Sequence, residues 1–310
     1  MQHVLVEMCE HGVNKTRVYQ QPYLEGKLPR MIVGLDFGIT NLDGAMLNGQ
    51  IFERGWRVDC PGAGLASLEA ALVTGGVALE GVTAIGTTGG KHRELPASWR
   101  GVPLVKVAEA DAVGRGGLQL ANLEAEIALS AALVVSAGTG TAMYAVRGHD
   151  CQHVTGSAVG GGTLLGLAKF LIGTADPLEI AELAARGDPS QVDGTLLDVI
   201  GGGIGHLPPD ATAVNLGRLA KLETLPRRED VAAGLVTLVA QVIAVIALNA
   251  AKAADLERIV FVGHLMDLQP IQAAVRRVWG FYGVSQPPII PAQRGFATAL
   301  GAAIKASEIE

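Results

Sequence analysis

The chain has 310 residues, of which 49% are hydrophobic and only 4% aromatic, and its formal net charge is −6 at pH 7. This length exceeds one typical domain and suits two lobes, each with its own apolar core. The acidic balance and the lack of a dense Lys/Arg cluster argue against a nucleic-acid partner.

The cysteines and the N-terminal segment give expectations about compartment. Cys9, Cys60 and Cys151 show neither zinc-ligand spacing nor a CxxC pair, so we expect reduced thiols in a cytoplasmic protein. Residues 1–30 are polar and lack the apolar segment of a secretory signal. Because they look unlike the rest of the chain, we expect a loosely attached N-terminal extension.

Residues 31–130 are expected to form an N-terminal lobe. Short apolar runs separated by Gly, Asn and other polar residues are typical of strands joined by turns. The patterns predict strands over 32–36, 42–47, 51–58, 82–87 and 102–107, and helices over 64–74 and 109–120.

Residues 131–310 are expected to form a C-terminal lobe. Asp176 and Gly187 are placed to cap the ends of one of its helices. The predicted strands are 131–136 and 141–146, which form a hairpin, with 259–263 and 288–290; the predicted helices are 164–172, 177–186, 213–221, 230–254, 271–279 and 296–306.

The helix expected over 230–254 is apolar on nearly all sides, so we expect it to be buried in the core or in a dimer interface. The apolar stretch 231–254 contains Gln241, Asn249 and Lys252. A membrane span of about 20 residues would be more uniformly apolar. We therefore expect no membrane association.

Three loops that combine glycine with threonine follow apolar runs. Glycine lets backbone N–H groups approach phosphate oxygens, and threonine adds a hydroxyl donor. The loops suggest a nucleotide held between two lobes, and Asp36 is placed to hold Mg²⁺ directly or through water. The candidate phosphate-binding residues are Gly38, Thr40 and Asn41; Ser136, Gly138, Thr139, Gly140 and Thr141; and Gly160, Gly161, Gly162 and Thr163.

Each of these residues also has a simpler interpretation. Asp36 could cap the local turn, and 138–140 could be an ordinary hairpin turn. Glu109 and Asp111 point to different sides of a helix, so at most one need line the cleft, and Glu109 could simply be an acid at a helix N-terminus. Asn215 could cap a helix or touch a ligand.

Several short segments, taken in order, resemble the type II pantothenate kinases, a branch of the acetate and sugar kinase/heat-shock/actin superfamily. The strings are individually weak, but their order and spacing match, and GGGTLLGL is the most specific. They are GLDFGIT at 34–40, TGG at 88–90 followed by Glu94, VAEADA at 107–112, SAGTGT at 136–141, GGGTLLGL at 160–167, ATAVNLG at 211–217, FVG at 261–263 and the segment 295–301.

The resemblance implies an α/β, two-lobed, actin-like ATPase (ribonuclease H-like) fold with a nucleotide cleft between the lobes. It implies a homodimer that phosphorylates pantothenate with ATP and Mg²⁺. Glu94 would be the catalytic base, while Glu109 and His153 would meet the substrate. Gly263 and Gly295 would border the adenine pocket.

Three positions depart from the family pattern. Ile39 replaces a glycine, Asp43 stands where the family has a lysine, and His153 stands where it has an arginine. The last two exchanges remove cations expected near phosphate; Arg147 is near enough in sequence to offer a replacement. His206 and His264 are interpreted as surface or loop residues.

These departures leave two alternatives to a pantothenate kinase. One is a related kinase that acts on another small hydroxyl compound. The other is a non-catalytic nucleotide-binding or regulatory relative.

Overall fold

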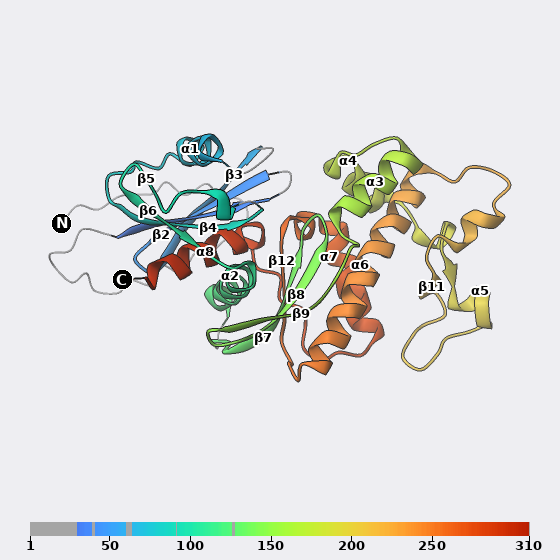
Figure 1. Ribbon diagram of the computed structural model, residues 1–310. Helices are drawn as coiled ribbons and strands as arrows, with labels where there is room; N and C mark the ends of the chain where they lie inside the picture. The colour runs from blue at the N-terminus through green and yellow to red at the C-terminus, as the bar shows by residue number, and fades with distance from the viewer. Residues whose placement is uncertain (1–29, 39–40, 60–63, 91, 126–127, 310) are drawn as a thin grey trace, which may run out of the picture.

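The computed structural model describes residues 30–38, 41–59, 64–90, 92–125 and 128–309. Two β-sheets lie side by side, with helices α2 (Glu109–Glu124) and α8 (Ala297–Ser307) between them (Figure 1). The expected α/β architecture with two sheet-based halves is confirmed. The expected extension 1–30 lies outside the described residues except for Arg30.

The first sheet has six strands, with β1 (Met31–Phe37) near its centre. β1 is antiparallel to β2 and parallel to β4. Helix α1 (Leu65–Thr74) covers one face of the sheet, and α8 covers the other. The remaining strands flank β1 in the order β3 (Ile51–Asp59), β2 (Asn41–Asn48), β1, β4 (Val82–Gly89), β6 (Val102–Lys106) and β5 (Ser98–Trp99).

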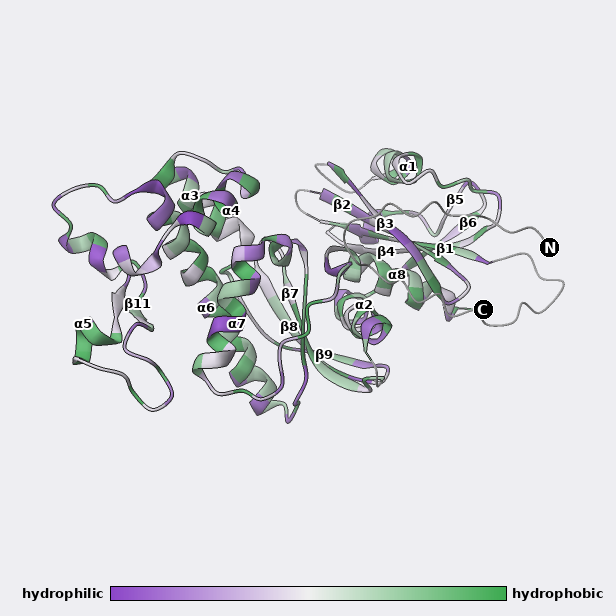
Figure 2. Cartoon of the chain, turned by 180° about the vertical axis from the view of Figure 1, so that it is seen from behind, coloured by the Kyte–Doolittle hydropathy of each residue, from purple (hydrophilic) through white to green (hydrophobic). Residues whose placement is uncertain are grey.

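The second sheet has four strands. Its hairpin of β7 and β8 was expected, but the edge strand β9 was not, because the segment is polar and largely exposed. One face of the sheet packs on α6 (Arg228–Ala253) and the other on α2, so apolar residues of β7, β8 and β12 enter a core on each face. Figure 2 shows the hydropathy along β7 and β8. The order is β12 (Ile259–Val262), β7 (Ala131–Ala137), β8 (Thr141–Arg147) and β9 (Asp150–Ser157).

Helix α6 (Arg228–Ala253) is the centre of the second core, surrounded by α3 (Gly161–Ile172), α4 (Pro177–Arg186) and α7 (Gln269–Phe281). The Asp176 carboxylate caps α4 by accepting a bond from the Leu178 N–H, as expected. In the described part of the chain, only α6 is long and apolar enough to cross a membrane, and 61% of that stretch is buried. A core helix of a globular protein meets the same criteria.

The segment expected as a helix over 213–221 is not one. It forms strand β11 (Thr212–Val214) and a 3₁₀ helix, Gly217–Lys221. Leu216 between them has a φ of 56°, and its N–H donates to the buried Asp193 carboxylate at 2.7 Å. That left-handed residue interrupts the helical path. β11 pairs with β10 (Gly194–Thr195), which leads into the short helix α5 (Leu196–Ile200).

Glycine allows α2, α8 and the first sheet to approach within backbone contact. A methyl group on Gly116 of α2 would lie 1.7 Å from the carbonyl oxygen of Ala297, and one on Gly301 would lie 1.8 Å from that of Ala112. Gly34 of β1 meets Ala299 in the same way. Helix α8 therefore packs on the first sheet although it ends the chain. The expected lobe boundary at residue 130 stays a prediction.

Replacing Gly116 by alanine is expected to destabilise the protein by about 3 kcal/mol or more, because the added methyl meets backbone that cannot move alone. The matched control is Gly166→Ala in α3, where a methyl group meets nothing within 4 Å; it is expected to raise stability by about 0.5–1 kcal/mol through helix propensity. Thermal unfolding followed by circular dichroism measures both. Equal effects at the two sites would contradict the packing argument.

Candidate functional site

The ends of four strands from the two sheets carry the glycine turns. β1 and β4 are parallel, as are β7 and β12, so each pair ends at the same edge of its sheet. The turns that follow contain Gly38, Gly89, Gly138 and Gly263. In open α/β sheets, ligands bind outside the carboxyl ends of the strands. The two sheet edges that carry these turns form the candidate site, and each is called the strand edge of its sheet below.

Asp36 lies at the strand edge of the first sheet, in register with Asp43 of β2 and Thr88 of β4. Residues paired across strands share a face of the sheet, so the two carboxylates and the hydroxyl form a row. Gly89 follows directly, with φ +85°, and a methyl group on it would lie 2.5 Å from Asp36 Oδ1. Only glycine combines this backbone conformation with so close an approach.

The row is electrostatically unbalanced. Burial, followed by repulsion from Asp43 and Glu109, raises the pKa of Asp36 to about 7, and His264 opposes the shift. Thr88 Oγ1 is buried without a hydrogen-bond partner in the described part of the chain. A desolvated carboxylate beside an unsatisfied hydroxyl suits a bound cation or its water ligands.

No group of three or more His, Cys, Asp or Glu side chains within the described ranges could hold a metal. This does not exclude Mg²⁺, which keeps several waters and is often held by one or two carboxylates together with phosphate oxygens. Asp36 fits that pattern of binding.

Glu94 lies in the short 3₁₀ helix that follows the Gly89–Gly90 turn. The Gly90 N–H donates to Phe37 O at 2.7 Å, which closes the turn onto β1. The 3₁₀ helix His92–Glu94 follows; its buried His92 places Nδ1 2.6 Å from Gly89 O, and Glu94 is exposed. A predicted catalytic base is thus tied by the backbone to the strand end that carries Asp36.

Tyr144 was not expected to be a site residue, but it contacts two residues that were, Glu109 and His153. Tyr144 of β8 donates from its hydroxyl to Glu109 Oε1 at 3.3 Å. His153 is the cross-strand partner of Tyr144, with the two rings edge to face at 5.5 Å. Burial and the Glu109 carboxylate both raise the pKa of Tyr144, so the phenol stays protonated. The structure therefore brings Glu109 and His153 together through Tyr144.

The second and third glycine loops are tied to each other. The N–H groups of Gly161 and Gly162 donate to the carbonyls of Gly138 and Thr139 at 2.8 and 2.9 Å. The Thr141 hydroxyl donates to Val159 O, and the Thr163 hydroxyl to Ala158 O. These donors stabilise the loop pair, which leaves its exposed tip, Thr139 and Gly140, most accessible to a ligand.

The other predicted phosphate residues have mixed outcomes. Ser136 is half-buried at the end of β7, and Gly160 is buried against the Thr139–Gly140 backbone. Gly38 is exposed, and Asn41 begins β2. Thr40 and the departure Ile39 lie outside the described residues.

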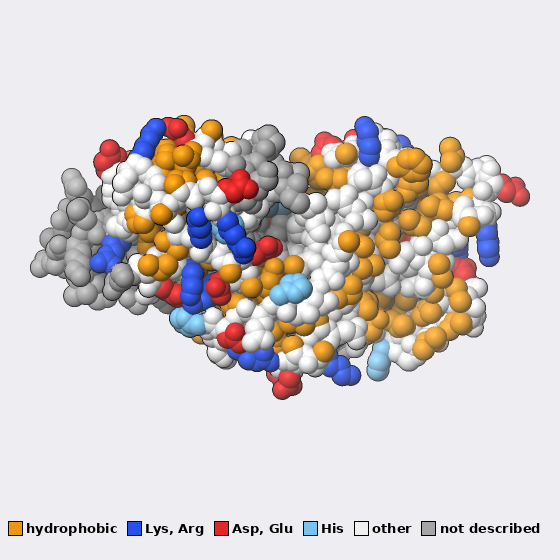
Figure 3. All heavy atoms as spheres, viewed as in Figure 1, with side chains coloured by type: hydrophobic (Ala, Val, Ile, Leu, Met, Phe, Trp, Pro, Cys, Tyr) orange, Lys and Arg blue, Asp and Glu red, His pale blue; other side chains and the backbone are white. Residues whose placement is uncertain are grey.

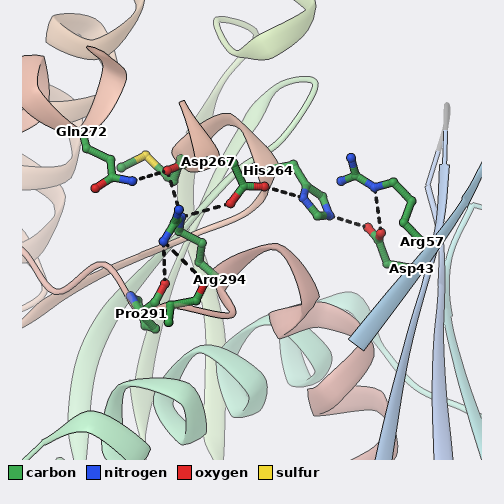
Figure 4. Close-up of polar contacts among 9 residues, drawn as sticks. Asp43, Arg57, His264, Asp267, Gln272, Pro291 and Arg294 are labelled. Carbon is green, nitrogen blue, oxygen red and sulfur yellow. Dashed lines mark hydrogen bonds and ion pairs between the residues drawn. The ribbon is translucent and has the colours of Figure 1, made fainter. Parts of the chain in front are cut away.

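The interpretation of His264 as a surface or loop residue was wrong. Its side chain is only 26% exposed, and its two ring nitrogens lie 3.0 Å from Asp43 and 2.8 Å from Asp267 (Figure 4). Gly263 and Gly295 make room for this arrangement: Gly263 has φ +94°, and a methyl on Gly295 would enter the His264 ring. His206 is exposed, as expected.

A cavity of about 600 Å³ opens beside this segment, between α4, α6 and α7. It is bordered by Asp267 and Leu268, three and four residues after His264, and its walls are largely apolar. This size and character are typical of small-molecule pockets. Further lining residues include Leu178, Glu182, Val236 and Arg277.

In the structure, Arg147 and Asn215 make contacts that differ from those suggested by the sequence. Arg147 cannot replace a missing cation, because it lies at the other end of β8, about 20 Å from Thr141 at ~3.3 Å per residue; there it donates to Ala254 O. Asn215 caps no helix in the structure, and its side-chain amide donates to Gln241 Oε1 at 3.0 Å.

Comparison with known proteins identifies the family of the chain. The Fumble family model matches residues 123–305. The type II pantothenate kinase of Oceanobacillus iheyensis is 29% identical over 186 residues, covering 60% of this chain and 68% of that protein, and one from Bacillus cereus is 28% identical over 184 residues, covering 59% and 67%.

Solved structures share the fold. An activator of 2-hydroxyisocaproyl-CoA dehydratase from Clostridium difficile with bound ADPNP has a TM-score of 0.61 at 19% identity, covering 90% of this chain and 94% of that one. A ROK family glucokinase from Streptomyces griseus in complex with glucose and AMPPNP has a TM-score of 0.52 at 18% identity, covering 90% and 99%. The two-lobed actin-like ATPase fold is thus confirmed. Because the family match spans more than half of its length, the chain belongs to the Fumble family.

Proposed function

We propose that the chain is a pantothenate kinase, which transfers the γ-phosphoryl group of ATP to the hydroxyl of pantothenate and makes 4′-phosphopantothenate for coenzyme A biosynthesis. The observation that carries the proposal is the Gly89–Gly90 turn. Its backbone packs against Asp36, and the next 3₁₀ helix presents Glu94. A carboxylate that would bind the cation and a base are thereby held at the end of the same strand. The names of the relatives indicate pantothenate as the substrate.

In this reaction most of the rate comes from positioning and charge stabilisation. Mg²⁺ bound with ATP would offset the charge of the triphosphate, and Asp36, with the Thr88 hydroxyl, would hold it or its waters. Thr139 and Gly140 would meet phosphate oxygens. The cavity bordered by Asp267 has room for the nucleotide base.

On the substrate side, Glu94 would accept the proton from the pantothenate hydroxyl as the new P–O bond forms. Tyr144 would hold Glu109 in place for hydrogen bonds to the polar arm of pantothenate. His153, on the same face, would border this part of the site. Glu94 would thereby deprotonate the substrate, and Glu109 with its neighbours would orient it.

We further propose that two copies of the chain pair, in the cytoplasm. Apolar side chains gather over the part of the molecule that carries α5, α6 and β11 (Figure 3). A contiguous apolar surface of this kind differs from singly scattered apolar residues and is typical of an interaction site. Its exposed members include Leu197, Val199, Ile200, Ile204, Val214, Leu222 and Leu225.

The kinase assignment predicts ADP release from MgATP that depends on pantothenate. Removing the base by Glu94→Gln is expected to lower kcat by about 10²–10⁴-fold, because the hydroxyl must then lose its proton without a positioned acceptor. A coupled ADP assay measures both. The control is Glu80→Gln, the same change at an exposed position before β4.

The outcomes separate the alternatives. Turnover by the wild type that is lost only in the Glu94 variant supports the assignment. Turnover with a different small alcohol but not with pantothenate would move the protein to another kinase of this fold. Nucleotide binding without turnover on any alcohol would favour a regulatory relative.

The raised pKa of Asp36 predicts competition between protons and Mg²⁺. Below about pH 7 the metal-free carboxyl is protonated, so the affinity for Mg²⁺-nucleotide should fall about tenfold per pH unit there and level off above pH 7. Titration calorimetry from pH 5.5 to 8.5 measures it. Asp36→Asn should leave only the titration of the nucleotide itself, whereas Asp210→Asn in an exposed loop should behave as wild type. Identical pH profiles for wild type and Asp36→Asn would contradict this role.

Tyr144→Phe tests the hydrogen bond to Glu109. Loss of a bond to a charged group is expected to lower kcat/KM for pantothenate about tenfold. KM for ATP should stay unchanged, since the bond lies on the substrate side. Steady-state kinetics with each substrate varied in turn will check this, with the half-exposed Tyr282→Phe as control. An equal effect on both substrates would remove Tyr144 from the substrate side.

A further inference from the structure

Five side chains of alternating charge connect the two lobes (Figure 4). On the first sheet, Arg57 Nε of β3 lies 3.1 Å from Asp43 Oδ1 of β2. On the second lobe, Arg294 Nε lies 3.1 Å from Asp267 Oδ1. His264 joins the two pairs, since Nε2 lies 3.0 Å from Asp43 Oδ2 and Nδ1 lies 2.8 Å from Asp267 Oδ2.

Two carboxylates within hydrogen-bond distance of the two ring nitrogens favour the imidazolium form. A neutral imidazole carries one N–H and one acceptor nitrogen, so it can donate to only one of two carboxylates. The other carboxylate would then face a lone pair at hydrogen-bond distance. Only the cation donates from both nitrogens, and each bond is then charge-assisted.

The surroundings favour that cation. Burial alone would lower the pKa of His264, but the hydrogen bonds to Asp267 and Asp43 outweigh it, and the pKa is raised. The charged groups that face the ring are Asp43 from β2, Arg57 from β3, Asp267 from its own 3₁₀ helix, Arg294 from the segment before α8 and, at longer range, Asp36 from β1. Phe296 contacts the ring edge to face at 5.6 Å.

We propose that His264 is a clasp between the lobes: its imidazolium bridges Asp43 and Asp267 and holds the site closed, and the clasp must open for nucleotide to enter or leave. The contact with Asp43 is the link between lobes, because Asp267 and His264 belong to one 3₁₀ helix. The same helix borders the cavity assigned to the nucleotide base. The nucleotide part rests on the proposed function; the clasp itself does not.

The sign of the pH dependence follows from the raised pKa. A group with a raised pKa in the closed form contributes its full stabilisation below its ordinary pKa and loses it as pH rises through the raised value. The clasp is therefore closed in acid and is released as pH rises through the raised pKa of His264.

Hydrogen exchange of the nucleotide-free protein tests the clasp itself. After correction for intrinsic rates, peptides covering β2 and residues 263–268 should exchange about five- to tenfold faster once the clasp is lost, the size expected for a partly exposed charge-assisted bond. In the wild type this loss should appear as pH rises from 6 to 9. In His264→Gln and Asp43→Asn it should be present at every pH, and combining the two should add nothing. His206→Gln, at an exposed position, is the control.

Release of a fluorescent ATP analogue, followed by stopped flow, tests the link to nucleotide. Release should be about five- to tenfold faster in His264→Gln than in wild type at pH 6, and the difference should shrink as pH rises. Wild-type exchange that is independent of pH, or a His264 variant that matches it at pH 6, would overturn the clasp. Analogue that fails to bind any variant, with the exchange behaviour as expected, would overturn the proposed nucleotide site and leave the clasp standing. No variant is needed for the wild-type pH series, so a poorly folded mutant does not block the test.

Discussion

The crossing of α2 and α8 at backbone contact is the constraint on which the site depends. Gly116 and Gly301 let each helix reach the other's carbonyls, and Gly34 lets the sheet approach α8 equally closely. Since α2 also covers one face of the second sheet, this helix pair determines how the two sheets face one another. The relative positions of Asp36 on one sheet and Tyr144 on the other therefore depend on these glycine contacts. A methyl group in the crossing would displace the site as well as loosen the core.

Charge compensation divides the acidic groups of the site into two kinds. Asp43 is matched within the protein by Arg57 and His264. Asp36 is not matched in this way, and its pKa near 7 reflects that imbalance. A buried carboxylate without a partner destabilises the fold unless a ligand brings positive charge. A ligand that brings positive charge would offset this imbalance, which is consistent with the Mg²⁺ and nucleotide proposed for this site.

Much of this could be predicted from the sequence, and the failures have physical causes. The strands before each glycine turn are apolar and short, so local pattern alone located β1, β4, β7 and β12. The helix expected over 213–221 does not form, because the Asp193 carboxylate, some twenty residues away, accepts a hydrogen bond from the Leu216 N–H. Tyr144 was missed because β8 is a nearly continuous apolar run that is buried along most of its length, so a tyrosine within it looks like a core residue. Its pairing with His153 appears only in the structure, because strand β9 was not expected from the sequence.

Asp43 and His264 show why departures from a family pattern are hard to judge one at a time. Taken alone, the exchange of lysine for Asp43 subtracts a cation from the site and favours an inactive relative. The structure pairs Asp43 with Arg57 and His264, so its negative charge is compensated inside the protein and is not left facing phosphate. The two positions are 221 residues apart, and no local pattern connects them. Asp43 alone therefore does not imply loss of activity, because its ion pairs with Arg57 and His264 compensate its charge inside the protein.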